Sequence, residues 1–439
     1  MTQHWWTRVT VGCTTGLAIT GMTIVGVVAQ PAANRGTFGA PGAGAWVTAW
    51  ATSQQALGDT AVTNATVRLI ARVTIPGETV RIRLDNGYGA DSVRIGRAAL
   101  AYRVQGPLVA AGSTKPLTFG GAVDAILPPG GTLWSDPVAM PVLAQQDLAI
   151  SLFIPGQNVR PSQHTNAVVT SYRTPNGGGD RTADESRAPF TETLTATWWL
   201  KSVEVQSSAA AGTIVAFGDS ITDGTCTMLD AHDRWVDVLS VRLGLDYDAA
   251  LRAGRPAKLK AIINEGIGGN TVTREVQPLP DSTPAVERLE RDVLSHHGIT
   301  DVIVFIGTND LRREGTVAQI TTGLSAIISR IRAAGTASGG TPPRVVGVTM
   351  IPRHNVAPSP NNTGWNDEKS RRRREVNEWI RTKAGFDAVL DFDAMVRDAK
   401  QPDLIQPPLN CGDGIHPSPA GYYTIGRAIP LAAFGSDGR

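Results

Sequence analysis

The sequence has few of the residue patterns that reveal a bound metal or nucleotide. Only 3 of its 439 residues are cysteines, and neither a CxxC nor an HExxH spacing occurs, so no zinc signature is present. No pair of carboxylates stands out as a glycosidase site. The Gly-rich stretch GIGG at 266–269 lacks the GxGxxG spacing and the lysine of a phosphate-binding loop. We therefore expect no metal and no organic cofactor.

A large excess of charge of either sign is also missing. The chain has 41 Lys and Arg against 39 Asp and Glu, a net charge of +2, which gives no support for nucleic-acid binding by bulk electrostatics. The one dense basic run, Arg371–Arg374, is flanked by acidic residues in a helix-like segment. We expect a solvated helix face there, and a site for an anionic partner is the alternative.

One apolar stretch stands apart at the start of the chain. Residues 9–28 are mostly apolar, Arg8 precedes them, and Val27-Val28-Ala29 supplies small residues before a cleavage point. This pattern predicts a signal peptide over 1–29, a secreted, extracellular protein, and no stable membrane span after cleavage. A retained membrane anchor is the alternative, since about 20 residues can span a bilayer. The Gly-, Ala- and Pro-rich residues 30–44 are predicted to be a linker.

The remaining length is too great for one ordinary domain, and its first part has the pattern of strands. Apolar and charged side chains alternate from Val80 to Asp85, and turn pairs such as Asn86-Gly87 recur along the region. Many short strands without a long helical pattern predict an all-β sandwich, jelly-roll-like, over 45–205. We expect its tryptophans in the core, with stacking on sugar rings as the alternative: Trp46, Trp50, Trp198 and Trp199.

After a small polar and alanine-rich joint at 206–212, the pattern changes to alternating strands and helices. Apolar runs begin near 213, 261, 301, 344 and 388, and segments with helical periodicity separate them. This alternation predicts a parallel sheet with helices on both faces over 213–435, a three-layer α/β domain. In such a sheet the functional site lies beyond the carboxyl ends of the strands.

Chemically capable residues follow three of these predicted strands and precede the last predicted helix. Ser220 lies in GDSITDG, Gly269 in GIGGNT, and Asn309 in GTND, while Asp413 and His416 lie in DGIHP. A serine nucleophile needs a histidine base, a carboxylate that fixes the histidine tautomer, and donors for an oxyanion. Each block alone has an ordinary interpretation as a turn, a helix cap or a surface loop. Their joint order predicts nucleophile Ser220, base His416 and orienting Asp413, with oxyanion donors from Ser220 N–H, Gly269 N–H and the Asn309 amide.

These four blocks, in this order, resemble those of the SGNH or GDSL hydrolases. The resemblance covers about residues 212–435 and implies a flavodoxin-like sheet with the same five residues in the same roles. Asp219, which precedes the nucleophile, is expected to be a turn or capping group. The other histidines after the signal segment have no comparable partner in the sequence, and we expect them to be structural or exposed: His164, His232, His296, His297 and His354.

The two cysteines beyond the signal segment flank the predicted site in sequence. Cys226 lies six residues after Ser220, and Cys411 lies two residues before Asp413. If Ser220 and His416 meet, the two thiols come to the same neighbourhood, and an oxidising compartment favours a disulfide between them. Two buried free thiols are the alternative.

The two-domain layout resembles secreted members of the family that are related to acetylxylan esterases. It implies a carboxylic ester hydrolase whose partner is an ester substrate, with acetylated polysaccharide as the expected class. A broad-specificity esterase or lipase for short to medium acyl chains is one alternative. A carbohydrate-binding protein with an idle hydrolase domain is another. No segment has the character of the large apolar cover of long-chain lipases, and the loop at 350–368 is expected to border the cleft.

Overall fold

The computed structural model describes residues 35–277, 282–354 and 364–434. The predicted signal peptide at 1–29 therefore lies outside the described residues, as do the first part of the predicted linker and the middle of the loop at 350–368. The described residues from Gly36 onward belong to one compact unit. Within the described ranges, no helix combines the length and apolar character needed to cross a membrane.

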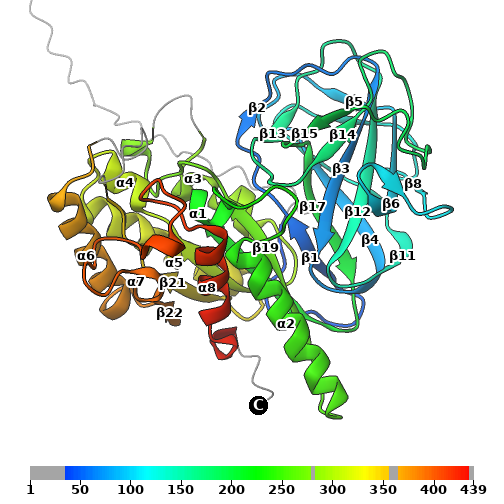
Figure 1. Cartoon of the computed structure of the whole chain (residues 1–439). Coiled ribbons are helices and arrows are strands. Elements are labelled where there is room, and N and C mark those ends of the chain that lie inside the picture. Colours follow the sequence, from blue (N-terminus) through cyan, green and yellow to red (C-terminus); the bar gives the residue numbers. More distant parts are fainter. Residues whose placement is uncertain (1–34, 278–281, 355–363, 435–439) are drawn as a thin grey trace, which may run out of the picture. The chain divides into compact units, whose positions relative to one another are not determined.

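The first part of the described chain is all-β, and its strands pair antiparallel (Figure 1). One sheet has the order β1-β17-β4-β10, with β11 also paired to β4, and the other large sheet has the order β15-β14-β3-β12-β6-β7, with β8 paired to β6. Their bounds are β1 (Trp46–Ala51), β3 (Ala65–Val73), β4 (Gly77–Asp85), β6 (Arg97–Gln105), β7 (Leu108–Val109), β8 (Lys115–Leu117), β10 (Thr132–Trp134), β11 (Val138–Val142), β12 (Gln146–Ile154), β14 (Ser171–Arg173), β15 (Glu192–Leu194) and β17 (Leu200–Gln206).

Two smaller ladders complete this β part. The first joins β16 (Thr197–Trp198), β13 (Ser162–His164) and β2 (Ala56–Leu57), and the second joins β5 (Val93–Ile95) and β9 (Ala125–Leu127). Val80, Ile82 and Leu84 of β4 are fully buried, as the alternation predicts, but the charged side chains between them are not all solvated, because Arg83 and Asp85 are 2% and 1% exposed. The all-β, antiparallel character is confirmed, while the sandwich layering stays a prediction.

The second part contains a five-stranded parallel sheet of order β19-β18-β20-β21-β22. Its strands are β18 (Ala210–Gly218), β19 (Leu259–Gly266), β20 (Ile299–Phe305), β21 (Arg344–Val348) and β22 (Ala388–Leu390). Each of the five strands coincides with one of the predicted apolar runs. Counted along this part, the order is 2-1-3-4-5, which is the strand order of flavodoxin-like sheets, and it reverses between the first and third strands. The flavodoxin-like layering itself stays a prediction.

Helices connect these strands, and several begin at side-chain caps. Thr316 and Asn366 accept hydrogen bonds from the first turns of α5 and α6, and Ser418 does so for α8, which has proline at its first position. The bounds are α1 (Ser220–Asp223), α2 (Trp235–Arg252), α3 (Ala285–Leu289), α4 (Thr308–Arg312), α5 (Val317–Ala337), α6 (Asp367–Thr382), α7 (Phe392–Val396) and α8 (Pro419–Ala428), with a π-helical turn at Glu290–Leu294 and 3₁₀ turns at Arg274–Val276, Pro407–Leu409 and Leu431–Phe434.

Three expectations about local structure need correction. The joint predicted at 206–212 is shorter, because β17 ends at Gln206 and β18 already begins at Ala210. Part of the predicted linker pairs with the α/β part, since Gly39 N–H donates to the Ile299 carbonyl. The basic run is not wholly solvated: Arg373 is buried and donates to Asp393 and Asp403, because the helical period turns one of the four side chains inward.

Two of the four tryptophans considered above, Trp198 and Trp199, follow the core interpretation. Trp198 and Trp199 are 3% and 0% exposed and belong to the main apolar cluster. Trp46 and Trp50 are half-buried, and the Arg81 guanidinium lies 4.2 Å from the centre of the Trp46 ring. These positions leave two of the four tryptophans partly accessible.

Buried charges join the β part to the α/β part. Lys201 on β17 donates to Glu265 on β19 at 3.2 Å and to Asp292 at 2.8 Å, and all three side chains are essentially inaccessible to solvent. Burial alone raises the pKa of Glu265, but Lys201 and His296 lower it below its usual value. Removing one member of such a group leaves an uncompensated buried charge, which typically costs about 3–5 kcal/mol.

Candidate active site

The ends of three neighbouring strands bring the predicted blocks together. Gly218, the last residue of β18, is the register partner of Gly266 on β19 and of Phe305 on β20. Adjacent strands lie about 4.8 Å apart, so the loops that follow them start side by side. Ser220 and Asn309 lie in the first turns of α1 and α4, the helices that follow two of these strands. The crevice at the carboxyl edge between β18 and β20, where the strand order reverses, is the usual ligand position in such sheets.

Ser220 is presented by a tight turn from β18 into α1. Asp219 caps this short helix, since its carboxylate accepts from the Ile221 N–H at 3.0 Å, which confirms its expected capping role. A Cβ at Gly218 would lie 2.3 Å from Thr222 Oγ1 and 2.6 Å from the Phe305 carbonyl. Only glycine fits at this position, which explains the first residue of the GDS motif.

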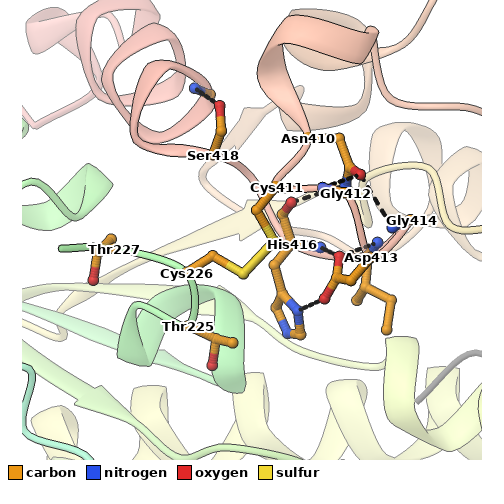
Figure 2. Close-up of a disulfide and its surroundings, with 12 residues drawn as sticks. Thr225, Cys226, Thr227, Asn410, Cys411, Gly412, Asp413, Gly414, His416 and Ser418 are labelled. Carbon is orange, nitrogen blue, oxygen red and sulfur yellow. Dashed lines mark hydrogen bonds and ion pairs between the residues drawn. A yellow bond between two sulfur atoms is a disulfide. The ribbon is translucent and has the colours of Figure 1, made fainter. Parts of the chain in front are cut away.

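His416 and Asp413 lie on the loop before α8 and reach the serine. Ser220 Oγ is 2.8 Å from His416 Nε2, and His416 Nδ1 is 2.5 Å from Asp413 Oδ2. The other carboxylate oxygen of Asp413 accepts from the backbone N–H groups of Ile415 and His416 at 2.8 and 2.9 Å (Figure 2). The predicted base and orienting residue therefore lie in hydrogen-bonding order with the predicted nucleophile.

The charges in this loop fix the histidine tautomer. Partial burial alone raises the pKa of Asp413, but the hydrogen bond and charge of His416, with the two backbone donors, lower it to about 2. Asp413 is therefore ionised at neutral pH and accepts a hydrogen bond from the N–H at His416 Nδ1. Nε2 is then unprotonated and can accept the hydroxyl proton of Ser220.

Asn410 shapes the same loop, and the sequence analysis missed it. Its side-chain oxygen accepts from the N–H groups of Gly412 and Gly414, and its amide donates to the His416 carbonyl at 2.9 Å (Figure 2). An asparagine two residues before a glycine is a common turn signal, so the sequence did contain a hint. Asn410 holds the backbone that carries both Asp413 and His416.

The Gly269 N–H and the Asn309 side-chain amide stay predicted oxyanion donors. Gly269 has φ +72°, which favours glycine, and a Cβ there would meet only Arg313 Nη2, at 3.6 Å. Across the described ranges, its N–H donates no hydrogen bond. Asn309 is 5% exposed, and its amide donates to the Asn270 carbonyl in the GIGGNT loop at 3.1 Å. One amide hydrogen of Asn309 is thereby fixed, and the second remains for another acceptor.

Asp310, next to Asn309, holds the backbone that directly follows the GIGGNT block. Its carboxylate accepts from the N–H of Val272 at 2.9 and 3.1 Å and from that of Thr273 at 3.3 Å. Burial raises the pKa of Asp310 to about 7, and burial also raises that of Asp219 to about 6. Asn309 and Asp310 both lie inside α4, whose N-cap is Gly307. Neither of them therefore caps this helix.

Cys226 and Cys411 form a disulfide, as predicted (Figure 2). Their Cα atoms are 6.3 Å apart, and 185 positions separate them in the sequence. Cys226 lies in the loop after α1, and Cys411 opens the loop that contains His416. The bond therefore ties the loop that follows the serine to the loop of the histidine.

Three of the remaining histidines hydrogen-bond to carboxylates that are distant in sequence, and His232 Nε2 lies 4.0 Å from Asp147 Oδ1. His164 lies 3.0 Å from Asp223, His296 lies 2.7 Å from Glu265, and His297 Nδ1 lies 2.7 Å from Glu204. His164 and His296 are buried. Each pair joins residues 31 or more positions apart, which the sequence could not reveal. Their structural interpretation is retained.

A serine, a histidine and an aspartate in this hydrogen-bonded order are the arrangement that serine hydrolases use. Residues 216–423 match the model of the GDSL-like Lipase/Acylhydrolase family. This part of the chain belongs to that family, and the protein is an enzyme of the ester-hydrolase class. No curated protein matches the chain.

Solved structures similar to the chain cover about half of it. Est24, a carbohydrate acetylesterase from Sinorhizobium meliloti, is 22% identical with a TM-score of 0.38, over 49% of this chain and 95% of that one. The aryl esterase of M. smegmatis is 22% identical with a TM-score of 0.40, over 51% and 99%. A putative arylesterase from Agrobacterium tumefaciens is 22% identical with a TM-score of 0.39, over 51% and 99%.

Proposed function

We propose that this protein is a secreted serine esterase that hydrolyses carboxylic esters through Ser220, His416 and Asp413. The observation that carries the proposal is the hydrogen-bonded chain from Ser220 Oγ to His416 Nε2 at 2.8 Å and from His416 Nδ1 to Asp413 at 2.5 Å. The ionised Asp413 keeps the proton on Nδ1, so Nε2 is the base that faces the hydroxyl.

The reaction proceeds in two steps. Ser220 Oγ attacks the ester carbonyl while His416 Nε2 takes the hydroxyl proton, and the oxyanion accepts from Ser220 N–H, Gly269 N–H and the Asn309 amide. His416 then gives the proton to the departing alcohol, which leaves an acyl group on Ser220. A water molecule attacks this acyl group as His416 takes its proton, and the carboxylic acid leaves as Ser220 Oγ regains a proton. Each oxyanion donor typically contributes about 3–4 kcal/mol to the transition state.

Acetylated polysaccharide is the substrate class that we propose. The layout of an all-β part ahead of the hydrolase part resembles secreted esterases related to acetylxylan esterases, and the half-buried Trp46 and Trp50 give the β part aromatic surface for sugar rings. Secretion is supported by the disulfide between Cys226 and Cys411, because such bonds persist in oxidising compartments.

The finer fold belongs to the same proposal. We infer a jelly-roll-like sandwich for 45–205 and a flavodoxin-like, three-layer hydrolase domain for 213–435. The 2-1-3-4-5 strand order supports the second inference, and the two large antiparallel sheets support the first.

The test compares the wild-type protein with Ser220→Ala. We expect the variant to lose p-nitrophenyl acetate hydrolysis by several orders of magnitude while its unfolding temperature is unchanged. Acetate release from acetylated xylan is then measured beside a series of acyl esters of increasing length. Preference for long acyl chains would contradict the polysaccharide assignment and favour a broad esterase or lipase. Binding of polysaccharide without any ester cleavage would indicate an idle hydrolase domain.

A further inference from the structure

Two residues of the β part, Ser53 and His164, hydrogen-bond to residues of the α/β part that lie close to the proposed active site. Ser53, between β1 and β2, is 0% exposed. Its hydroxyl donates to Glu265 Oε2 at 2.5 Å and accepts from Arg288 Nη1 at 3.0 Å. Its backbone carbonyl lies 2.8 Å from His164 Nδ1, on β13. Ser53 thus bonds at the same time to β19, to α3 and to another strand of its own part.

Arg288 connects Ser53 to the backbone around the nucleophile and the oxyanion loop. Its buried guanidinium donates to the Gly218 carbonyl at 2.7 Å, to the Glu265 carbonyl at 2.9 Å and to Asn270 Oδ1 at 2.9 Å. Gly218 lies two residues before Ser220, and the Asn270 carbonyl accepts from the Asn309 amide. One side chain therefore bonds to the ends of two strands and to the side chain of Asn270, the residue whose backbone carbonyl accepts from a predicted oxyanion donor.

His164 connects the β part to the other side of the same loop. Its Nε2 faces Asp223 Oδ1 at 3.0 Å and the Asn166 carbonyl at 3.2 Å, while Nδ1 faces the Ser53 carbonyl. All three neighbours accept hydrogen bonds, so both ring nitrogens carry protons and the imidazole is a cation. Burial alone lowers the pKa of His164, but the charge and hydrogen bond of Asp223 raise it above its usual value.

Asp223 connects His164 to the loop that contains Gly269. It lies on α1, three residues after the nucleophile, and its second oxygen accepts from the Gly268 N–H at 3.1 Å. Gly268 directly precedes Gly269, whose N–H is a predicted oxyanion donor. The chain of contacts from His164 to Asp223 to Gly268 sets the direction of the peptide that leads into that donor.

We propose that Ser53 and His164 are positioning residues for the oxyanion site, so that the β part completes the catalytic apparatus of the hydrolase part. This inference rests on the proposed function of Ser220, His416 and Asp413. Neither residue contacts the substrate. They act through Arg288 and Asp223 on the loop that contains Gly269 and on the amide of Asn309. A displacement of about 1 Å in such donors can cost a hundredfold in rate, whereas substrate binding away from the oxyanion is little affected.

The test measures kcat and KM separately for Ser53→Ala and His164→Gln. We expect kcat for p-nitrophenyl acetate to fall by roughly ten- to a hundredfold in each variant, with KM within about threefold of the wild-type value. Because both residues act on one network, the loss in the double variant is smaller than the product of the single losses. Covalent labelling of Ser220 with a fluorophosphonate counts the folded, reactive enzyme in every sample.

Matched controls separate positioning from general destabilisation. Ser151 is a buried serine of the β part that accepts from Arg68 at 2.9 Å, and His232 is a histidine with a largely buried side chain that shares a polar cavity of about 40 Å³ with His164. Within the described part of the chain, neither side chain has a hydrogen bond to residues 267–270. We expect Ser151→Ala and His232→Gln to keep kcat within about twofold, even where their unfolding temperatures fall as far as those of the test variants.

The outcomes distinguish this inference from the function on which it rests. An unchanged kcat in Ser53→Ala and His164→Gln, beside an inactive Ser220→Ala, overturns the positioning role alone. Equal losses in the control variants also overturn it. If Ser220→Ala retains its esterase activity, the proposed function fails and the inference fails with it. Should His164→Gln not fold, Ser53→Ala decides the question, because it removes a single hydroxyl.

Discussion

Replacement of Asp413 by asparagine tests whether this carboxylate sets the tautomer of His416. The change keeps the shape of the side chain but converts one acceptor oxygen into an NH₂ donor. In the structure, Oδ1 accepts from two backbone N–H groups at 2.8 and 2.9 Å, and Oδ2 accepts from His416 Nδ1 at 2.5 Å. An asparagine can satisfy only one of these two sides with its oxygen.

The hydrogen bonds at this position decide whether the NH₂ group of the asparagine faces the backbone or His416. If the NH₂ faced the backbone, two N–H groups would lose their acceptor at a cost of about 1–3 kcal/mol each. The NH₂ will therefore face His416 Nδ1, which must then be unprotonated, and the proton moves to Nε2. That tautomer cannot accept the Ser220 proton, so we expect kcat to fall by roughly 10⁴-fold, which equals about 5 kcal/mol of transition-state stabilisation.

The stability of the variant supplies a second number. The pKa of Asp413 is about 2, against an ordinary value of 3.8. A lowered pKa means that the ionised carboxylate stabilises the fold above about pH 4, and that this contribution disappears as the pH falls toward 2. Because the Asp413 side chain is partly exposed, solvent screening reduces the contribution of this shift at neutral pH to about 1–2 kcal/mol, which we expect Asp413→Asn to lose.

The assay compares kcat for p-nitrophenyl acetate and the urea midpoint with those of Asp136→Asn. Asp136 is a suitable control because it holds a turn in the β part by accepting from Thr118 Oγ1 and the N–H groups of Gly120 and Gly121. We expect this control to retain kcat. A folded Asp413→Asn enzyme whose kcat falls less than about tenfold would refute the tautomer argument.

Two further predictions concern stability. Replacement of both Cys226 and Cys411 by serine should lower the free energy of unfolding by up to about 5 kcal/mol in denaturant titrations, because their separation of 185 residues closes a long loop in the unfolded chain; equal midpoints with and without the bond would contradict this. Glu204, buried beside His297 and Arg81, has a pKa of about 2 against 4.5, so its contribution is complete above about pH 4.5 and is lost as the pH falls toward 2. Glu204→Gln should therefore cost about 3 kcal/mol at pH 7 and much less at pH 3, and a pH-independent difference in urea unfolding would refute the assignment.

The predicted strands and site residues could be read from the sequence because their signals are local. A buried parallel strand is a continuous apolar run, and the residue that follows it lies at a known edge of the sheet. Ser220, Gly269 and Asn309 each follow such a run within four residues. His416 and Asp413 are three residues apart, so their contact needs only one turn of the chain.

The contacts of the buried charges could not be read in this way. Ser53 and Arg288 are 235 positions apart, and their meeting depends on how the β part packs against α3. Arg373 shows the same limit on a smaller scale. The helical period requires that one arginine of the run turns inward, but its partner Asp393 lies 20 positions away on a separate helix. A sequence pattern gives the face of an element, whereas the partner on the other side is set by tertiary packing.

The ion pairs of Lys201 with Glu265 and Asp292 bear on how this enzyme can be cut or recombined. A shortened gene that starts after β17 would encode every residue of the proposed catalytic reaction, yet it would lack the Lys201 ammonium that pairs with Glu265 and Asp292 and would uncover the surface that the β part buries. Grafting the catalytic half onto a foreign binding module would meet the same obstacle unless the module offered an ammonium group at the same point. The β part and the α/β part should therefore be kept together in any engineered version of this enzyme.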